Sequence, residues 1–147
     1  SSAYNNNVQI FQAPEHVVIY NEMVHNARII PIGNGERHGL RQWSGESRAR
    51  WSGATLVIET RGFRQETSLG GSSRDTYVVE RLTRIDTDTV AYEFTVEDPN
   101  NFTKPWTAMM PLRRTDGPLF EYACHEGNIG MAGIMAGARN LDTQKVP

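Results

Sequence analysis

The chain has 147 residues, with 15 Lys and Arg against 17 Asp and Glu, which gives a formal net charge of −2. This length is typical of one domain that buries a core without disulfides or metal ions, and the single cysteine excludes an internal disulfide framework. The charge gives no electrostatic attraction for nucleic acid or an anionic membrane surface, and no apolar run approaches the roughly 20 residues of a membrane-spanning helix. The low hydrophobic share of 38% favours a small, polar-rich core or a barrel with a partly polar interior.

Short strands are predicted along most of the chain. Residues 1–7 are small and polar, and we expect them to form a flexible N-terminal segment. Beyond them, runs rich in β-branched and aromatic residues alternate with Gly, Pro, Asn and Asp, as in antiparallel strands joined by turns. The predicted strands cover residues 8–12, 16–23, 27–32, 47–51, 54–63, 77–85, 89–97, 106–114 and 119–125.

The clearest of these features is a hairpin over residues 77–97. Its second strand alternates strictly between apolar and polar side chains, the pattern of an antiparallel strand with one solvated face. Tyr92 and Phe94 belong to the apolar face. The alternation predicts that Glu80 and Glu93 lie on the opposite face from these two rings.

One helix is predicted near the C-terminus. Residues of about 128–139 are rich in Ala and Met, although three internal glycines each weaken a helix by ~1 kcal/mol relative to Ala. Residues 141–147 read as a tail. The sequence therefore predicts a single all-β domain over residues 8–140. We expect an antiparallel meander of about eight strands, forming a lipocalin-like barrel or a strongly curved sheet, with the helix closing one end.

Arginines on the predicted strands point to a binding surface. Arg48 and Arg50 share a strand face with Glu46, and Arg81 is a candidate to join them. If this face is the interior, the buried charges indicate a cavity for a polar or anionic ligand, because unpaired buried charge is costly. If it is the exterior, the same residues are solvated cross-strand pairs. Trp43, between polar loop residues, is the aromatic candidate for contact with a ligand.

The segment from Tyr122 onwards carries the densest set of reactive side chains. His125 and Glu126 are candidates for general acid and base, and His38, in a Gly-rich loop, is a third candidate. Cys124 and His125 are adjacent, so on a strand they face opposite sides and make a poor nucleophile–base pair. Tyr122 is a candidate ligand contact that shares a face with Cys124. No HxH or HxxxH spacing indicates a metal site, so neither a metal nor another cofactor is predicted.

An ordered set of motifs adds a family resemblance. W-x-G-x-T-L-V occurs at residues 51–57, V-E-R at 79–81, T-V-x-D-P at 95–99, P-W-T at 105–107 and E-Y-x-C at 121–124. In this order the motifs resemble a large group of uncharacterised, exported bacterial proteins. The resemblance implies a β-rich fold, export to the periplasm or beyond, and a chain that is either a short member or the C-terminal domain of something longer. It implies no activity and no catalytic residue.

Three functions are compatible with these features. The first is a non-catalytic domain that binds a small organic or saccharide ligand in the barrel mouth. The second is an acid–base enzyme, such as a lyase, isomerase or hydrolase, that uses His125, Glu126 and His38. The third is a homo-oligomeric assembly domain that uses an open edge strand and the small-residue helix. None of them calls for nucleic acid or a membrane span as a partner.

Overall fold

The structure, a computed structural model, describes residues 6–66, 71–122 and 130–143, which form two antiparallel sheets and one C-terminal helix. The smaller sheet has the order β1 (Val8–Gln12), β2 (His16–Asn21) and β3 (Asn26–Pro31), with the short 3-10 helix η1 (Met23–His25) between β2 and β3. The larger sheet contains β4 (Glu46–Ser52), β5 (Thr55–Arg61), β6 (Tyr77–Arg84), β7 (Thr89–Glu97) and β8 (Trp106–Arg113), in that order. Helix α1 covers Gly130–Thr143.

The two sheets bury one shared apolar core. Because side chains alternate between the faces of a strand, each sheet presents a row of apolar side chains to the other. The chain passes between the sheets where Gly33 N–H donates to the Ala49 carbonyl over 2.8 Å, next to a parallel bridge between Ile32 and Ala49. The buried core residues are Val17, Ile19 and Ile30 from the smaller sheet and Ala49, Leu56, Ile58 and Leu82 from the larger one.

The strand positions are largely as predicted, but the architecture differs from the predicted one. The described strands form two packed sheets, and no closed barrel is found among them. The predicted strand at 119–125 is wrong over residues 119–122, and the rest of it lies outside the described residues. In this segment the Phe120 N–H donates to Glu22 Oε1 over 2.7 Å and the Tyr122 N–H to His25 Nε2 over 2.9 Å. These amides are therefore bound by side chains at the β2–β3 turn.

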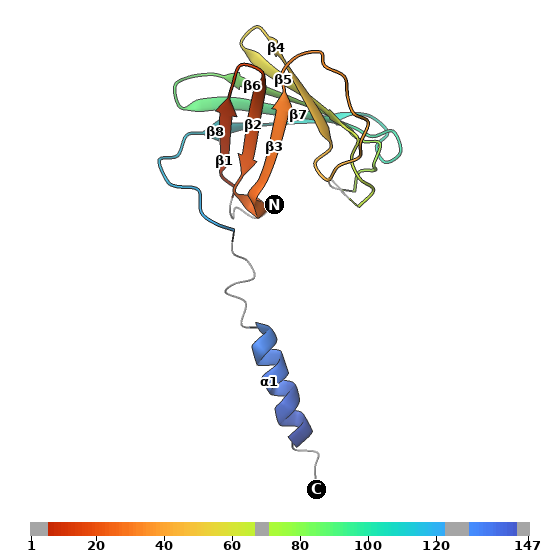
Figure 1. The fold of residues 1–147 in the computed structure, drawn as a ribbon, viewed down its shortest axis with the longest axis vertical. Coiled ribbons are helices and arrows are strands. Elements are labelled where there is room, and N and C mark those ends of the chain that lie inside the picture. The colour runs from red at the N-terminus through yellow and green to blue at the C-terminus, as the bar shows by residue number, and fades with distance from the viewer. Residues whose placement is uncertain (1–5, 67–70, 123–129, 144–147) are drawn as a thin grey trace.

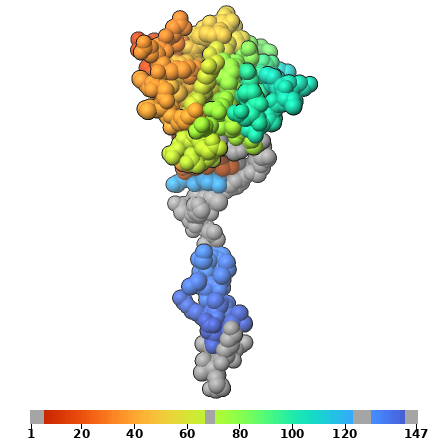
Figure 2. Space-filling view, turned by 90° about the vertical axis from the view of Figure 1, so that its right-hand side faces the viewer, coloured from red at the N-terminus to blue at the C-terminus, as the bar shows by residue number. Residues whose placement is uncertain are grey.

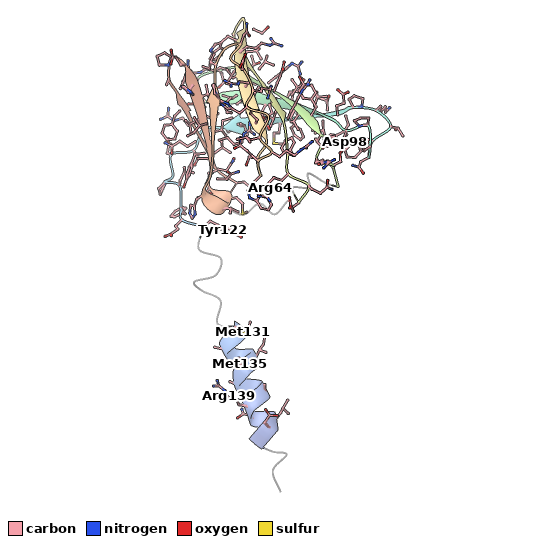
Figure 3. All side chains as sticks on the ribbon, turned by 45° about the vertical axis from the view of Figure 1, so that its right-hand side comes forward. Arg64, Asp98, Tyr122, Met131, Met135 and Arg139 are labelled. Carbon is pink, nitrogen blue, oxygen red and sulfur yellow. The ribbon has the colours of Figure 1, made fainter. Side chains whose placement is uncertain are left out.

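The sequence predicts that the C-terminal helix closes one end of the fold, and this prediction is wrong for helix α1. Its side chains are exposed from Gly130 to Asp142, and it packs against none of the described strands (Figures 1 and 2). Met131 and Met135 project from it into solvent (Figure 3). Packing of the helix on a partner helix through Gly130, Gly133 and Gly137 stays a prediction. Within the described residues, no helix combines the length and apolar character needed to cross a membrane.

A polar network links the two sheets inside the core. Arg28 of β3 donates to Glu80 of β6 through Nη1–Oε1 at 3.2 Å and Nη2–Oε2 at 2.5 Å. The Tyr92 hydroxyl donates to the same carboxylate over 2.8 Å. Burial, together with the Glu80 charge and this hydrogen bond, raises the pKa of Tyr92 above its ordinary value. The prediction that Glu80 faces away from Tyr92 and Phe94 is therefore wrong, because Glu80 is directly opposite Phe94 in the ladder.

Candidate functional site

A cavity of about 590 Å³ lies between β3 and the segment that leads into β4. We name it the Arg48 cavity. Among the described residues, four arginines line it, together with one histidine, one tryptophan and one carboxylate, so this part of the wall has an excess of cationic groups. These residues are Arg28, Arg41, Arg48, Arg64, His38, Trp43 and Glu46.

Arg48 is the cation of this cavity whose charge is least compensated. The Gly-rich loop that precedes β4 covers it, and its Nη2 donates to the Glu36 backbone carbonyl. Gly35 leaves room for the guanidinium, because a Cβ at that position would lie 3.1 Å from Arg48 Nη1. Glu59 is directly opposite Arg48 in the ladder but pairs with Arg50, at 3.7 Å. In the part of the chain that the structure describes, Arg48 has no carboxylate within 4.0 Å.

Two hydrogen-bond donors in the cavity wall lack an acceptor. Arg28 Nε and Arg48 Nε are both buried, and no acceptor within the described residues contacts either one. A buried donor without a partner costs roughly 1–3 kcal/mol, so such groups usually meet a ligand or water. The other three arginines of the cavity each have a carboxylate partner, namely Glu80 for Arg28, Asp75 for Arg41 and Glu66 for Arg64.

Glu46, the one carboxylate that lines the cavity among the described residues, accepts hydrogen bonds from backbone amides. Its Oε1 accepts from the His38 N–H at 2.7 Å and its Oε2 from the Gly39 N–H at 3.2 Å. Burial acts to raise its pKa, but these two hydrogen bonds and the nearby charges of His38 and Arg37 hold the pKa of Glu46 below its ordinary value of 4.5. The carboxylate therefore holds the loop at His38 and Gly39 and forms no ion pair with Arg48 among the described residues.

We expect Glu46→Gln to lower the free energy of unfolding by about 1–2 kcal/mol at neutral pH, because one accepting oxygen becomes an NH₂ group that faces an N–H donor. A lowered folded-state pKa means that the contribution of Glu46 is fully present above its unfolded pKa and is lost as pH falls through the folded value. Urea unfolding should therefore show a smaller difference in the free energy of unfolding between wild type and variant at pH 3 than at pH 7. Glu36→Gln, whose exposed side chain is outside this network, is the control. An equal difference at both pH values would contradict the role given to the Glu46 charge.

Trp43 and Arg64 form the rim of the Arg48 cavity. The Arg64 guanidinium lies 4.7 Å from the Trp43 ring centroid, a cation–π arrangement, and Trp43 is 59% exposed. Arg64 is near the η1 end of the sheets (Figure 3). An exposed indole beside a guanidinium offers an apolar platform and a cation to the same ligand.

No protein family, curated protein or solved structure matches the chain. Of the eight site residues predicted from sequence, the structure brings His38, Trp43 and Arg48 together in one cavity.

The other predicted site residues lie elsewhere. Arg50 and Arg81 are exposed on the larger sheet, where Arg50 pairs with Glu59 and Arg81 with Glu93 at 3.4 Å, so they match the exterior alternative. Tyr122 lies beside His25, at the end of the sheets from which the chain leads to α1 (Figure 3).

His125 and Glu126 lie outside the described residues, as does Cys124. An acid–base site that combines them with His38 therefore stays a prediction. Among residues 6–66, 71–122 and 130–143, no group of three His, Cys, Asp or Glu side chains is placed to hold a metal ion.

Sequence reasoning missed Arg28, Arg41 and Arg64 as members of the cavity. Arg41 and Arg64 come together because the Gln42 N–H donates to the Gly62 carbonyl and the Arg64 N–H to the Gln42 carbonyl. These contacts join segments about 20 positions apart that are not neighbouring strands of a predicted hairpin. No local pattern in the sequence signals such pairing.

Proposed function

We propose that the Arg48 cavity binds a small organic anion that carries a ring. The observation that supports this most is the Arg48 guanidinium, which is partly buried, has an unpartnered Nε–H and has no carboxylate within 4.0 Å in the described chain. A guanidinium presents its N–H groups as a planar fork that matches a carboxylate, and such charge-assisted hydrogen bonds are about twice as strong as neutral ones. A carboxylate ligand would pair with the charge of this guanidinium.

The rim adds a preference for a ring. Trp43 is half exposed beside the cavity, and a tryptophan in this position provides a large apolar face for stacking. A cavity of about 590 Å³ is within the usual size for a small organic ligand, which a few placed polar groups orient. The cavity lies beside β3 and β4, and in this proposal it takes the place of the expected barrel mouth.

We expect D-galacturonate or benzoate to bind and the neutral sugar D-galactose not to bind, as measured by isothermal titration calorimetry. Arg48→Gln should weaken anion binding at least about tenfold, because a charge-assisted pair is lost. Arg50→Gln is the matched control, since Arg50 is on the same strand but exposed and outside the cavity. Equal binding by the Arg48 variant and the wild type, or binding of galactose as tight as that of galacturonate, would contradict the proposal.

The motif set described above supports a second proposal, that the protein is exported. Fractionation of the native host tests this proposal. We expect the protein in the periplasm or the medium, and finding it in the cytoplasm would contradict the proposal.

A further inference from the structure

A second cavity, of about 400 Å³, shares Arg41 with the Arg48 cavity as a common wall. We name it the Arg61 cavity; Arg61, Arg74 and Tyr77 also line it. Figure 2 shows side by side, on one face, the orange, lime-green and teal segments that contain the lining residues of both cavities. The hydrogen bonds between residues 41–42 and 62–75 agree with this arrangement.

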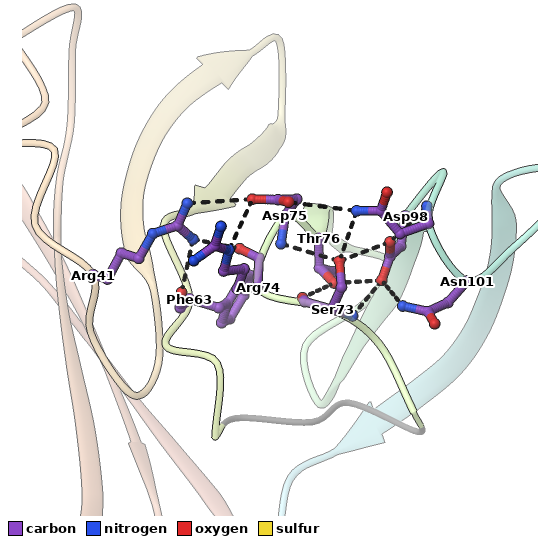
Figure 4. Close-up of polar contacts among 9 residues, drawn as sticks. Arg41, Phe63, Ser73, Arg74, Asp75, Thr76, Asp98 and Asn101 are labelled. Atoms are coloured by element: carbon purple, nitrogen blue, oxygen red, sulfur yellow. Dashed lines mark hydrogen bonds and ion pairs between the residues drawn. The ribbon is translucent and has the colours of Figure 1, made fainter.

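The wall between the two cavities is fixed by hydrogen bonds. Arg41 Nη1 donates to the Phe63 carbonyl at 3.1 Å and the Arg74 carbonyl at 2.8 Å, while its Nη2 contacts Asp75 Oδ1 at 3.2 Å (Figure 4). Arg41 therefore acts as a structural divider with a paired charge. A guanidinium whose donors are committed to the protein in this way is a poor candidate for the main ligand anchor.

The buried Asp98 holds the far wall of the Arg61 cavity. It accepts hydrogen bonds from the Ser73 hydroxyl at 2.9 Å and the Thr76 hydroxyl at 3.1 Å, and also from the Ser73 backbone N–H (Figure 4). Burial acts to raise its pKa, but these donors together hold the pKa of Asp98 well below its ordinary value. The segment that carries Arg74 and Tyr77 is thereby anchored to the end of β7.

Arg61 is an exposed arginine of the second cavity. Like Arg48, it has no carboxylate within 4.0 Å among the described residues, whereas Arg74 pairs with Asp75 at 4.0 Å. Its guanidinium lies 4.1 Å from the centroid of the Tyr77 ring. Each cavity thus contains a guanidinium without an ion pair and an aromatic ring, on either side of the wall formed by Arg41. Among the described residues, the carboxylates of Asp75 and Glu97 also line the Arg61 cavity.

We infer that the two cavities are neighbouring subsites for one acidic oligosaccharide. This inference rests on the proposed function of the Arg48 cavity and extends it to a second sugar. In each subsite the guanidinium would bind a sugar carboxylate and the aromatic ring would face the apolar side of the sugar ring. A net charge of −2 disfavours nucleic acid, whose binding depends on neutralising many phosphates.

The test compares D-galacturonate with its trimer by calorimetry on the full chain. We expect the trimer to bind at least about tenfold more tightly than the monomer, since a second charge-assisted contact forms without a second loss of translational freedom. Arg61→Gln should remove this gain and leave monomer binding to the Arg48 cavity unchanged, whereas Arg48→Gln should weaken both. Arg50→Gln should change neither, and neutral cellotriose should not bind.

Each result has a distinct meaning. Equal affinities for monomer and trimer, or a gain that survives Arg61→Gln, would overturn the second subsite and leave the proposed function standing. A six-nucleotide DNA strand that binds more tightly than the trimer would overturn the saccharide class. Failure of both sugars to bind, or binding of both that Arg48→Gln does not weaken, would overturn the proposed function and the inference together.

Discussion

Glu80→Gln should destabilise the fold by about 3–5 kcal/mol, the usual cost of removing one partner from a buried ion pair. The Glu80 side chain is 4% exposed, and its carboxylate accepts both Nη groups of Arg28 and the Tyr92 hydroxyl. A glutamine keeps the shape but removes the charge and one acceptor. Arg28, 20% exposed, would then retain a positive charge at the boundary between the sheets without an ion-pair partner.

The measurement is the free energy of unfolding from urea titration at pH 7. Glu93→Gln is a matched control on the neighbouring strand, because Glu93 pairs with Arg81 at 3.4 Å on the exposed face. Exposed pairs contribute about 0–1 kcal/mol, so this variant should lie close to the wild type. Similar losses in the two variants would show that the Arg28–Glu80 pair does not hold the sheets together.

Ile30→Ala should cost about 2–5 kcal/mol, the range measured when a large aliphatic side chain is removed from a packed core. Ile30 of β3 is fully buried, at 0% exposed, and belongs to the core cluster that both sheets share. The surrounding side chains come from two different sheets and can collapse only in part around the missing atoms. The variant should therefore unfold at a lower urea concentration with an unchanged m-value.

Ile29→Ala provides the comparison for this prediction. Ile29 is the preceding residue on the same strand but faces solvent, with 69% of its surface exposed. Its substitution should cost less than about 1 kcal/mol, which covers the lower strand propensity of alanine. A larger loss for Ile29 than for Ile30 would mean that the opposite face of β3 packs against the larger sheet.

The strands themselves could be predicted from the sequence because their signals are local. The second strand of the hairpin at residues 77–97 alternates strictly, and β6 and β7 lie within this hairpin. The division into two sheets could not be predicted, since it depends on how β3 meets β4. The error over Glu80 has a similar cause. Alternation assigns faces within one strand, whereas the face that two strands share is set by their register, which places Glu80 opposite Phe94.

The candidate site shows the same limit. His38, Trp43 and Arg48 belong to one short stretch of chain, and the sequence could identify each of them as a candidate site residue. Arg50 shares a strand face with Arg48, but the preceding loop reaches only as far as Arg48, whose Nη2 bonds to the Glu36 carbonyl. Which residues of a strand are covered by a loop depends on the tertiary structure. The sequence pattern alone therefore could not separate these two arginines.

The Arg28–Glu80 pair also bears on the order in which the chain can fold during synthesis. Its two partners are 52 positions apart, and the bond between Glu22 and the Phe120 amide spans 98 positions. A nascent chain that contains only β1 to β3 has the arginine but neither the carboxylate nor the second half of the core. Contacts between such distant positions slow folding and leave early segments exposed to aggregation. We therefore expect the first three strands to become stable only after β6 and β7 have left the ribosome.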